Sequence, residues 1–321
     1  MTRFELRPAT PGDLVGLAAL VNRSKTHDGV PRRTTVAALG SEFADDEFDP
    51  DADARVVELE GELVAAGRVW FHEAGTGQER AYLHGDVDPS CRGRGIGRRL
   101  LAWQIERATE RLAGTTAGLP RYVRVEQYDF VADAHRLYER CGLRAARWFD
   151  EMLRPLDAPL PRIRPVDGVE IVDWPRERDA ELRTVKNLAF AEHWGSAPMS
   201  EAAWAGWMTG AHTRLDLSVA ALDRATGEIV GHCICTHAPA DEAATGRREG
   251  WIDNVGTVPA ARGKGLAPLM IAICLQRFAE HGFTHAALVV DADHPSNAPE
   301  IYRRLGFTTA FRQLHREAAL P

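Results

Sequence analysis

The sequence predicts an α/β protein built from two similar domains, and three observations support this fold class. A strand, a glycine-rich loop and an apolar helix follow one another over residues 250–282. The same succession occurs earlier, over residues 81–112. The chain of 321 residues is also long enough for two domains that each bury a core of their own.

The elements of the first half alternate between strands and helices. An acidic stretch at residues 45–51 separates its first helix from a hairpin that turns at Glu60-Gly61. We interpret that stretch as a solvated, mobile cover; meeting a cationic substrate is the alternative. The predicted strands are Phe4–Arg7, Arg55–Leu59, Leu63–His72, Ala81–Val87, Arg121–Glu126 and Trp148–Leu153, and the predicted helices are Leu14–Asn22, Ile96–Leu112 and Ala132–Arg140.

Four prolines between Pro155 and Gly168 hold the chain extended and indicate a linker. The same order of elements returns after it, so the predicted domains are residues 1–154 and 169–321, joined by residues 155–168. The second set comprises strands at Val169–Val172, Ser218–Leu222, Glu228–Cys235, Gly250–Val258 and Ala286–Val290, a helix at Glu181–Trp194, the loop helix to Gly282, and a last helix and strand to Gln313.

The repeat has a nearly constant offset. Arg262 follows Arg92 by 170 residues, and Tyr302 follows Tyr138 by 164. A period this long indicates a duplicated domain, because the units of solenoid proteins are far shorter.

The composition is that of a globular protein. Hydrophobic residues make up 45% of the chain and charged residues 26%, and the net charge is −7. That charge gives no general attraction to nucleic acid or anionic membranes, although local basic loops can hold phosphates. The segment Met1–Pro8 lacks the apolar core of a signal peptide, and no apolar run has membrane-spanning length. We expect a cytoplasmic protein with neither nucleic acid nor membrane as a partner.

The five cysteines, an odd and scattered set, indicate reduced thiols, and we expect no disulfide. The run from His232 to His237 superficially resembles a metal-binding segment. Along a strand, however, alternation puts Cys233, Cys235 and His237 on one face and His232 on the other, and the spacing matches none of the usual zinc pairs. We interpret these cysteines as core thiols and expect no metal.

The two glycine-rich loops suit an anion. Glycines let the backbone approach a ligand closely, the loop N–H groups point into one concavity, and the following helix adds the positive end of its dipole. A pyrophosphate fits such a site. The loops are Val87-Asp88-Pro89-Ser90-Cys91-Arg92-Gly93-Arg94-Gly95-Ile96-Gly97 and Val255-Gly256-Thr257-Val258-Pro259-Ala260-Ala261-Arg262-Gly263-Lys264-Gly265-Leu266-Ala267.

A second repeated motif follows each loop after one strand. It runs from Ala134 to Leu143 in the first half and from Ala298 to Phe307 in the second, with a tyrosine in the middle and a glycine near the end. The two motifs, in this order and present twice, resemble the GNAT superfamily of acetyl-CoA-dependent N-acetyltransferases in a tandem arrangement. The resemblance covers nearly the whole chain and implies a mixed sheet with flanking helices.

The resemblance assigns roles to particular residues. It implies that strand Gly250–Val258 pairs with the pantetheine arm of acetyl-CoA, that Asn297 hydrogen-bonds this arm, and that Tyr302 protonates the departing thiolate. The residues implied in cofactor binding are Val255, Thr257, Val258, Arg262, Gly263, Lys264, Gly265, Leu266, Ala267 and Asn297 in the second half, and Val87, Arg92, Gly93, Arg94, Gly95, Ile96 and Gly97 in the first.

The amine acceptor arrives protonated, so a base or a water relay must remove a proton. Asp253 and Glu249 share one strand parity just before the second loop, and either could face the substrate or be a plain surface carboxylate. Asp253 is nearer to the point where the sheet would open. His84 and Asp86 are the corresponding, weaker candidates in the first half.

The two halves are not equivalent. Asp133 stands where the second half has Asn297, and a carboxylate offers no N–H donor to the pantetheine amides. We therefore expect catalysis chiefly in the second half. The first half, with its intact loop, is expected either to bind coenzyme A or to pack as a pseudo-active domain, and Tyr138 could be a core residue.

The resemblance implies that the helix pair and loop around residues 189–198, which Trp204 and Trp207 follow, line the acceptor side of the second half. Glu192 and His193 are candidate substrate-binding residues there, although aromatic-rich helices more often serve packing. The resulting hypothesis is acetyl transfer from acetyl-CoA to a primary amine of a small molecule. A non-catalytic coenzyme A sensor or scaffold and a protein acetyltransferase are the alternatives.

Overall fold

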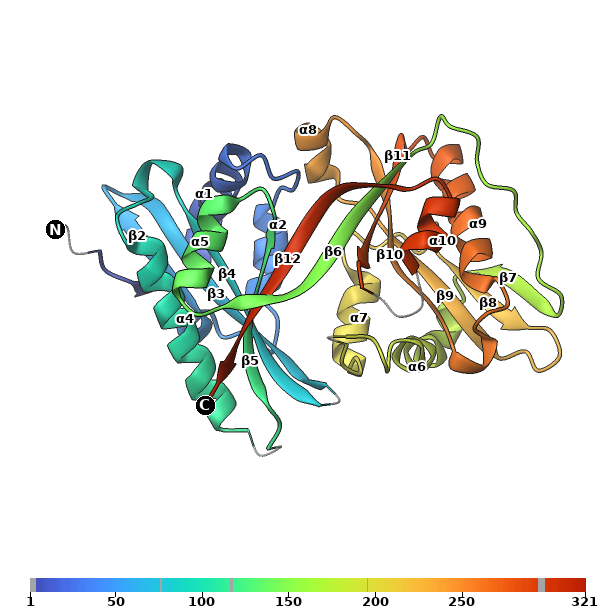
Figure 1. Cartoon of the computed structure of the whole chain (residues 1–321), viewed down its shortest axis with the longest axis horizontal. Helices are drawn as coiled ribbons and strands as arrows, with labels where there is room; N and C mark the ends of the chain where they lie inside the picture. Colours follow the sequence, from blue (N-terminus) through green and yellow to red (C-terminus); the bar gives the residue numbers. More distant parts are fainter. Residues whose placement is uncertain (1–3, 76, 116–117, 195, 294–297) are drawn as a thin grey trace. The chain divides into compact units, whose positions relative to one another are not determined.

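The protein folds as two compact units, which are described separately (Figure 1). The computed structural model describes residues 4–75, 77–115, 118–194, 196–293 and 298–321. Unit 1 comprises Met1–Arg147, Ala243–Thr245 and Gln313–Pro321. Unit 2 comprises Trp148–Glu242 and Gly246–Arg312.

The sheet of unit 1 is mixed, with β4 and β5 parallel and the other paired neighbours antiparallel. Its predicted hairpin is confirmed: Glu60 and Gly61 have φ of 52° and 84°, the left-handed conformation that a two-residue turn between twisted strands needs. The strands, in spatial order, are β1 (Arg7–Pro8), β2 (Ala54–Leu59), β3 (Glu62–Gly75), β4 (Gln78–Val87), β5 (Arg121–Tyr128) and the end of β12 (Thr308–Leu320).

Helices α4 and α1 of unit 1 bury apolar side chains in two different hydrophobic clusters. α4 buries Leu101 and Ala108 in one hydrophobic cluster with Val69 and Val123 of the sheet. Leu17 of α1 belongs to a second cluster. The helices are α1 (Leu14–His27), α2 (Val36–Phe43), α3 (Pro50–Asp53), α4 (Ile96–Ala113) and α5 (Ala132–Arg140).

The acidic segment is more ordered than a solvated cover would be. Phe48 is 5% exposed and stacks on Trp70 with ring centroids 4.6 Å apart. Asp53, which closes α3, is fully buried and accepts hydrogen bonds from Arg107 and Arg111 of α4 at 2.7 and 2.9 Å. The aromatic ring and the buried carboxylate therefore fasten this part of the chain to the unit.

Unit 2 repeats the arrangement, with β10 and β11 as its parallel pair. The strands, in spatial order, are the end of β6 (Arg144–Pro155), β11 (His285–Asp291), β10 (Glu249–Thr257), β9 (Ile229–Thr236), β8 (Val219–Asp223) and β7 (Val169–Asp173). The helices are α6 (Asp179–Ala189), α7 (Glu201–Thr209), α9 (Leu266–Glu280) and α10 (Ala298–Arg304). The short helix α8 (Glu242–Thr245) begins at Glu242 in unit 2, and its other residues belong to unit 1. The prediction of a mixed sheet with flanking helices, present twice, is confirmed.

Alternation along β9 divides the core of unit 2. Cys233 and Cys235 belong to one cluster with Phe278 of α9, whereas Ile234 packs with Trp204 of α7. The predicted placement of the two cysteines on one face is thus confirmed. α6 ends at Ala189, five residues before the predicted end, where the Arg262 guanidinium donates to the last helical carbonyl at 3.1 Å.

The last strand of each half of the sequence contributes to the other unit. Residues 149–155 of β6 pair antiparallel with β11 in unit 2, and residues 313–320 of β12 pair antiparallel with β5 in unit 1 (Figure 1). The compact units therefore differ from the sequence boundaries at these two strands. Each sheet needs residues from both halves of the chain.

Candidate active site

The two glycine-rich loops have the same backbone geometry. In unit 2, Gly263 and Gly265 have φ of 77° and 85°, and Gly265 caps the N-terminus of α9. In unit 1, Gly93 and Gly95 have φ of 76° and 85°, and Gly95 caps α4. This left-handed conformation is costly for residues with a side chain, which explains the glycines.

The second loop offers unused backbone donors. Among the described residues, the N–H groups of residues 263–267 donate no backbone hydrogen bond. Free N–H groups at the start of a 15-residue helix, together with the helix dipole, form an anion-binding site. The loop geometry therefore suits phosphate groups.

The arginine of each loop has a structural contact. Arg262 donates to Glu192 at 2.9 Å, just after α6. Arg92 makes the corresponding ion pair with Asp28, just after α1, at 2.5 Å. These side chains hold each loop against the end of the first long helix of the unit and leave the loop backbone available to a ligand.

Beside each loop, the two parallel strands separate. β10 pairs with β11 only as far as Trp251, although β10 continues to Thr257. β4 pairs with β5 only as far as Tyr82, although β4 continues to Val87. Along the described strands, this leaves a free backbone edge that carries Val255 and Thr257 in unit 2. An extended ligand with amide groups could pair with that edge, as a peptide does in β-augmentation.

Asp253 lies at the point where β10 is irregular. The register of β10 against β9 shifts between Ile252 and Asn254, so Asp253 is the extra residue of a bulge. Its carboxylate accepts from the Trp207 indole N–H at 3.2 Å. Protein atoms crowd the carboxylate even though solvent reaches it, and this desolvation raises its pKa, while the indole hydrogen bond lowers it. A carboxylate of raised pKa is suited to accept a proton.

Glu249 has a different environment. It is only 4% exposed, at the start of β10, and forms an ion pair with Arg247 at 2.8 Å. The bulge at Asp253 also interrupts the strand parity on which their equivalence depended. The structure therefore places Asp253, and not Glu249, at a solvent-accessible position beside the separated strands.

Tyr302 lies on α10. Its side chain packs against the hydrophobic cluster that contains Phe278 of α9, and its ring is edge-on to that of Phe307. Burial raises its pKa, so the phenol stays protonated and can donate. Tyr138 lies on α5 and is similarly buried, with its pKa raised by burial and by nearby Asp86 and Asp28. Asn297 lies outside the described residues.

The remaining candidates occupy varied positions. Asp133 is exposed and pairs with Arg136 on its own helix. The pKa of Asp86 is raised by burial, and His84 lies exposed on β4. Glu192 and His193 lie in the turn after α6, where the His193 Nδ1 is 3.0 Å from the Trp194 carbonyl oxygen.

A buried polar pair beside the separated strands was not foreseen from the sequence. The His232 Nε2 lies 2.7 Å from the Asn254 Oδ1, and His232 is fully buried. Burial, the largest influence, lowers its pKa to about 4; the Asn254 hydrogen bond opposes this, and nearby Lys186 reinforces it. The Lys186 pKa is itself lowered by burial. The alternation of β9 placed His232 away from the cysteines but gave no sign of this partner.

Unit 1 has an open hollow beside its own separated strands, with a volume of about 640 Å³. Glu42 is oriented there by Arg68 and by the Trp70 indole N–H, both at 2.7 Å. Carboxylates and aromatic rings together suit an ammonium group. The residues that line the hollow are Ser41, Glu42, Asp45, Trp70, Tyr82, His84 and Glu126.

Comparison with known families identifies the class of protein that this fold and site define. The family model described as "Acetyltransferase (GNAT) family" matches residues 17–143 and again residues 180–307. The chain therefore belongs to the GNAT acetyltransferase family and carries its domain twice. Members of this family use acetyl-CoA, in agreement with the anion-binding loops.

No helix in the described part of the chain is both long and apolar enough to cross a membrane.

Individual relatives are similar to this chain over nearly its whole length. Mycothiol acetyltransferase of Rhodococcus erythropolis is 30% identical over 305 residues, which span 92% of this chain and 93% of that protein. The Thermobispora bispora protein of the same name is 29% identical over 315 residues, 95% of this chain and 96% of its own.

Solved structures agree on the fold. A GCN5-related N-acetyltransferase from Sphaerobacter thermophilus has a TM-score of 0.77 at 24% identity, covering 99% of this chain and 96% of its own. A tandem GNAT protein from the clavulanic acid biosynthesis pathway has a TM-score of 0.72 at 17% identity, covering 99% and 98%.

Proposed function

We propose that unit 2 transfers an acetyl group from acetyl-CoA directly to a primary amine of a small molecule. The observation that carries the proposal is the juxtaposition in one unit of free loop N–H groups, a free β10 edge and Asp253 at the bulge. The loop would hold the pyrophosphate, and Val255 and Thr257 lie on the edge that would pair with the pantetheine arm. A cytoplasmic location stays a prediction.

Each residue would do one piece of the chemistry. Acetyl-CoA supplies a thioester, whose carbonyl carbon the neutral amine attacks. Asp253 accepts a proton from the ammonium group, directly or through water, and so generates that neutral amine. Tyr302, kept protonated by burial, donates a proton to the departing sulfur and regains one, directly or through water, from the nitrogen that became positively charged on attack. The products are an amide and free coenzyme A, and no covalent enzyme intermediate is required.

The name of the relatives suggests the most specific acceptor. Mycothiol acetyltransferases at about 30% identity cover most of this chain, so acetylation of the mycothiol precursor amine, the mycothiol synthase reaction, is the first activity to test. Glu192 and His193 remain proposed acceptor contacts. A coenzyme A sensor or a protein acetyltransferase is the alternative.

The full-length protein should be assayed for release of free coenzyme A thiol with a panel of small amines. We expect amine-dependent release, which Asp253→Asn and Tyr302→Phe should each lower about 10²-fold or more in kcat/KM. Tyr138→Phe in unit 1 is the matched control and should retain turnover. Coenzyme A binding without acetylation of any small amine or peptide would favour the sensor, whereas acetylation of peptides alone would favour a protein substrate.

A further inference from the structure

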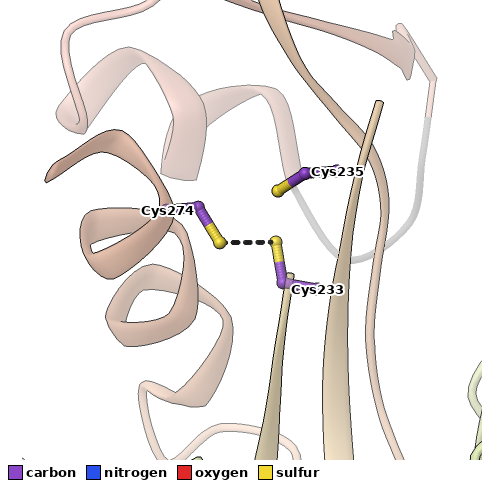
Figure 2. A group of neighbouring side chains, drawn as sticks. All are labelled: Cys233, Cys235 and Cys274. Atoms are coloured by element: carbon purple, nitrogen blue, oxygen red, sulfur yellow. Dashed lines mark hydrogen bonds between the residues drawn. The ribbon is translucent and has the colours of Figure 1, made fainter. Parts of the chain in front are cut away.

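Three cysteine thiols meet inside unit 2 (Figure 2). Cys233 and Cys235 project from β9 on the same face, and Cys274 comes from α9, which packs on that face. The Cys274 Sγ lies 3.5 Å from the Cys233 Sγ, and the three sulfur atoms all lie within 4.8 Å of one another. All three residues are fully buried.

We propose that Cys233, Cys235 and Cys274 form a three-thiolate site for a soft trivalent ion of the arsenic(III) class. Two sulfur atoms bound to one ion at about 2.3 Å lie roughly 3.4 to 4.0 Å apart for bond angles between about 95° and 120°. The sulfur atoms are already near this spacing, so small side-chain rotations would complete the site. Thiolate ligands select soft ions over hard ones.

The apolar surroundings of the three sulfur atoms determine which ionic charge the site favours. The sulfurs lie in an apolar cluster with Met270, Phe278 and Leu288. Three thiolates around a monovalent or divalent ion would leave net negative charge in this cluster, which is costly. Zinc would also require a fourth ligand. A trivalent ion with three thiolates is neutral.

The binding step balances without an oxidant. Neutral arsenous acid, As(OH)₃, exchanges its three hydroxyl groups for three thiolates. Three As–O bonds break, three As–S bonds form, and each thiol proton leaves with a hydroxide as water. No net charge is created in the core, so the apolar surroundings do not oppose binding at equilibrium. The site uses none of the residues proposed for catalysis and does not depend on that proposal.

Arsenite is the probe, and native mass spectrometry of the full chain is the readout. We expect one arsenic per chain, with the loss of three hydrogens, when binding is followed to equilibrium. Cys233→Ala, Cys235→Ala and Cys274→Ala should each weaken binding at least tenfold. Cys91→Ala changes another buried cysteine, in unit 1, and should bind like the wild type. Thermal unfolding should show that every variant is folded.

Three results would overturn the inference. The first is the absence of bound arsenic at equilibrium in the folded wild type. The second is arsenic binding that Cys274→Ala leaves unchanged. The third is tighter binding of Zn²⁺ or Cd²⁺ than of arsenite in direct competition, because the neutral-charge argument requires the opposite order.

Discussion

The buried imidazole of His232 should make stability depend on pH in a defined window. Burial lowers its pKa from 6.5 to about 4 in the folded state. Its Nε2–H donates to the Asn254 Oδ1 at 2.7 Å, and the buried Nδ1 has no hydrogen-bond partner among the described residues. The folded protein therefore holds the neutral ring, whereas the unfolded chain takes up a proton near pH 6.5.

The size of this change in stability follows from the unfolded and folded pKa values of His232. Because the folded pKa is the lower one, the contribution of His232 to stability is complete above pH 6.5 and is lost as the pH falls to about 4. The difference, 6.5 minus 4, multiplied by about 1.4 kcal/mol per unit, gives a full loss of about 3–4 kcal/mol, of which about 3 kcal/mol is reached by pH 4. Groups common to wild type and variant cancel in the comparison.

The assay is urea unfolding at a series of pH values from about 7.5 to 4, with His232→Gln, which cannot titrate, and His27→Gln on the surface as the control. Wild type should lose about 3 kcal/mol more than His232→Gln across this range, and His27→Gln should follow wild type. Parallel curves for wild type and His232→Gln would refute the assignment of a neutral, buried imidazole.

Three further outcomes are expected. Gly256→Ala should lower the free energy of unfolding by about 1–3 kcal/mol, since its Cβ would lie 2.8 Å from Ala189 and 2.9 Å from Phe190; unchanged urea unfolding would contradict this packing. Asp53→Asn should cost about 2–4 kcal/mol because it leaves two arginines of α4 without their buried carboxylate, and a loss below about 0.5 kcal/mol would show that the pair is unimportant. A fragment of residues 1–154 lacks the strand that pairs with β5 and should be unfolded or aggregated by circular dichroism and gel filtration unless residues 155–321 are supplied; a folded monomeric fragment would argue against the strand exchange.

Local signals predicted much of the fold. The helix expected at Ala132–Arg140 has those bounds in the structure, because apolar spacing and the following Cys141-Gly142 define it locally. The glycine-rich loops were likewise identified from their glycines, which are favoured where the backbone is left-handed. The boundaries of α6 were less accurate, since its end is fixed by Arg262, 73 residues further along the chain.

Contacts between residues far apart in the sequence could not be predicted from local patterns. The alternation of β12 identifies a strand but not its partner, so its pairing with β5 was not foreseeable. Cys274 likewise meets Cys233 only because α9 packs on β9, across 41 residues of sequence. At the candidate site, strand alternation predicted that Asp253 and Glu249 face the same side. A bulge at Asp253, which the sequence pattern does not indicate, breaks this alternation.

Calorimetric titration of acetyl-CoA, combined with the thiol-release assay, tests the central claim most directly. Gly265→Glu would place bulk and negative charge at the unit 2 loop, where φ is 85°, and Gly95→Glu would do the same in unit 1. The account predicts that Gly265→Glu loses acetyl transfer and one binding event, while Gly95→Glu retains transfer. Undiminished acetyl transfer by Gly265→Glu would contradict the assignment of catalysis to unit 2.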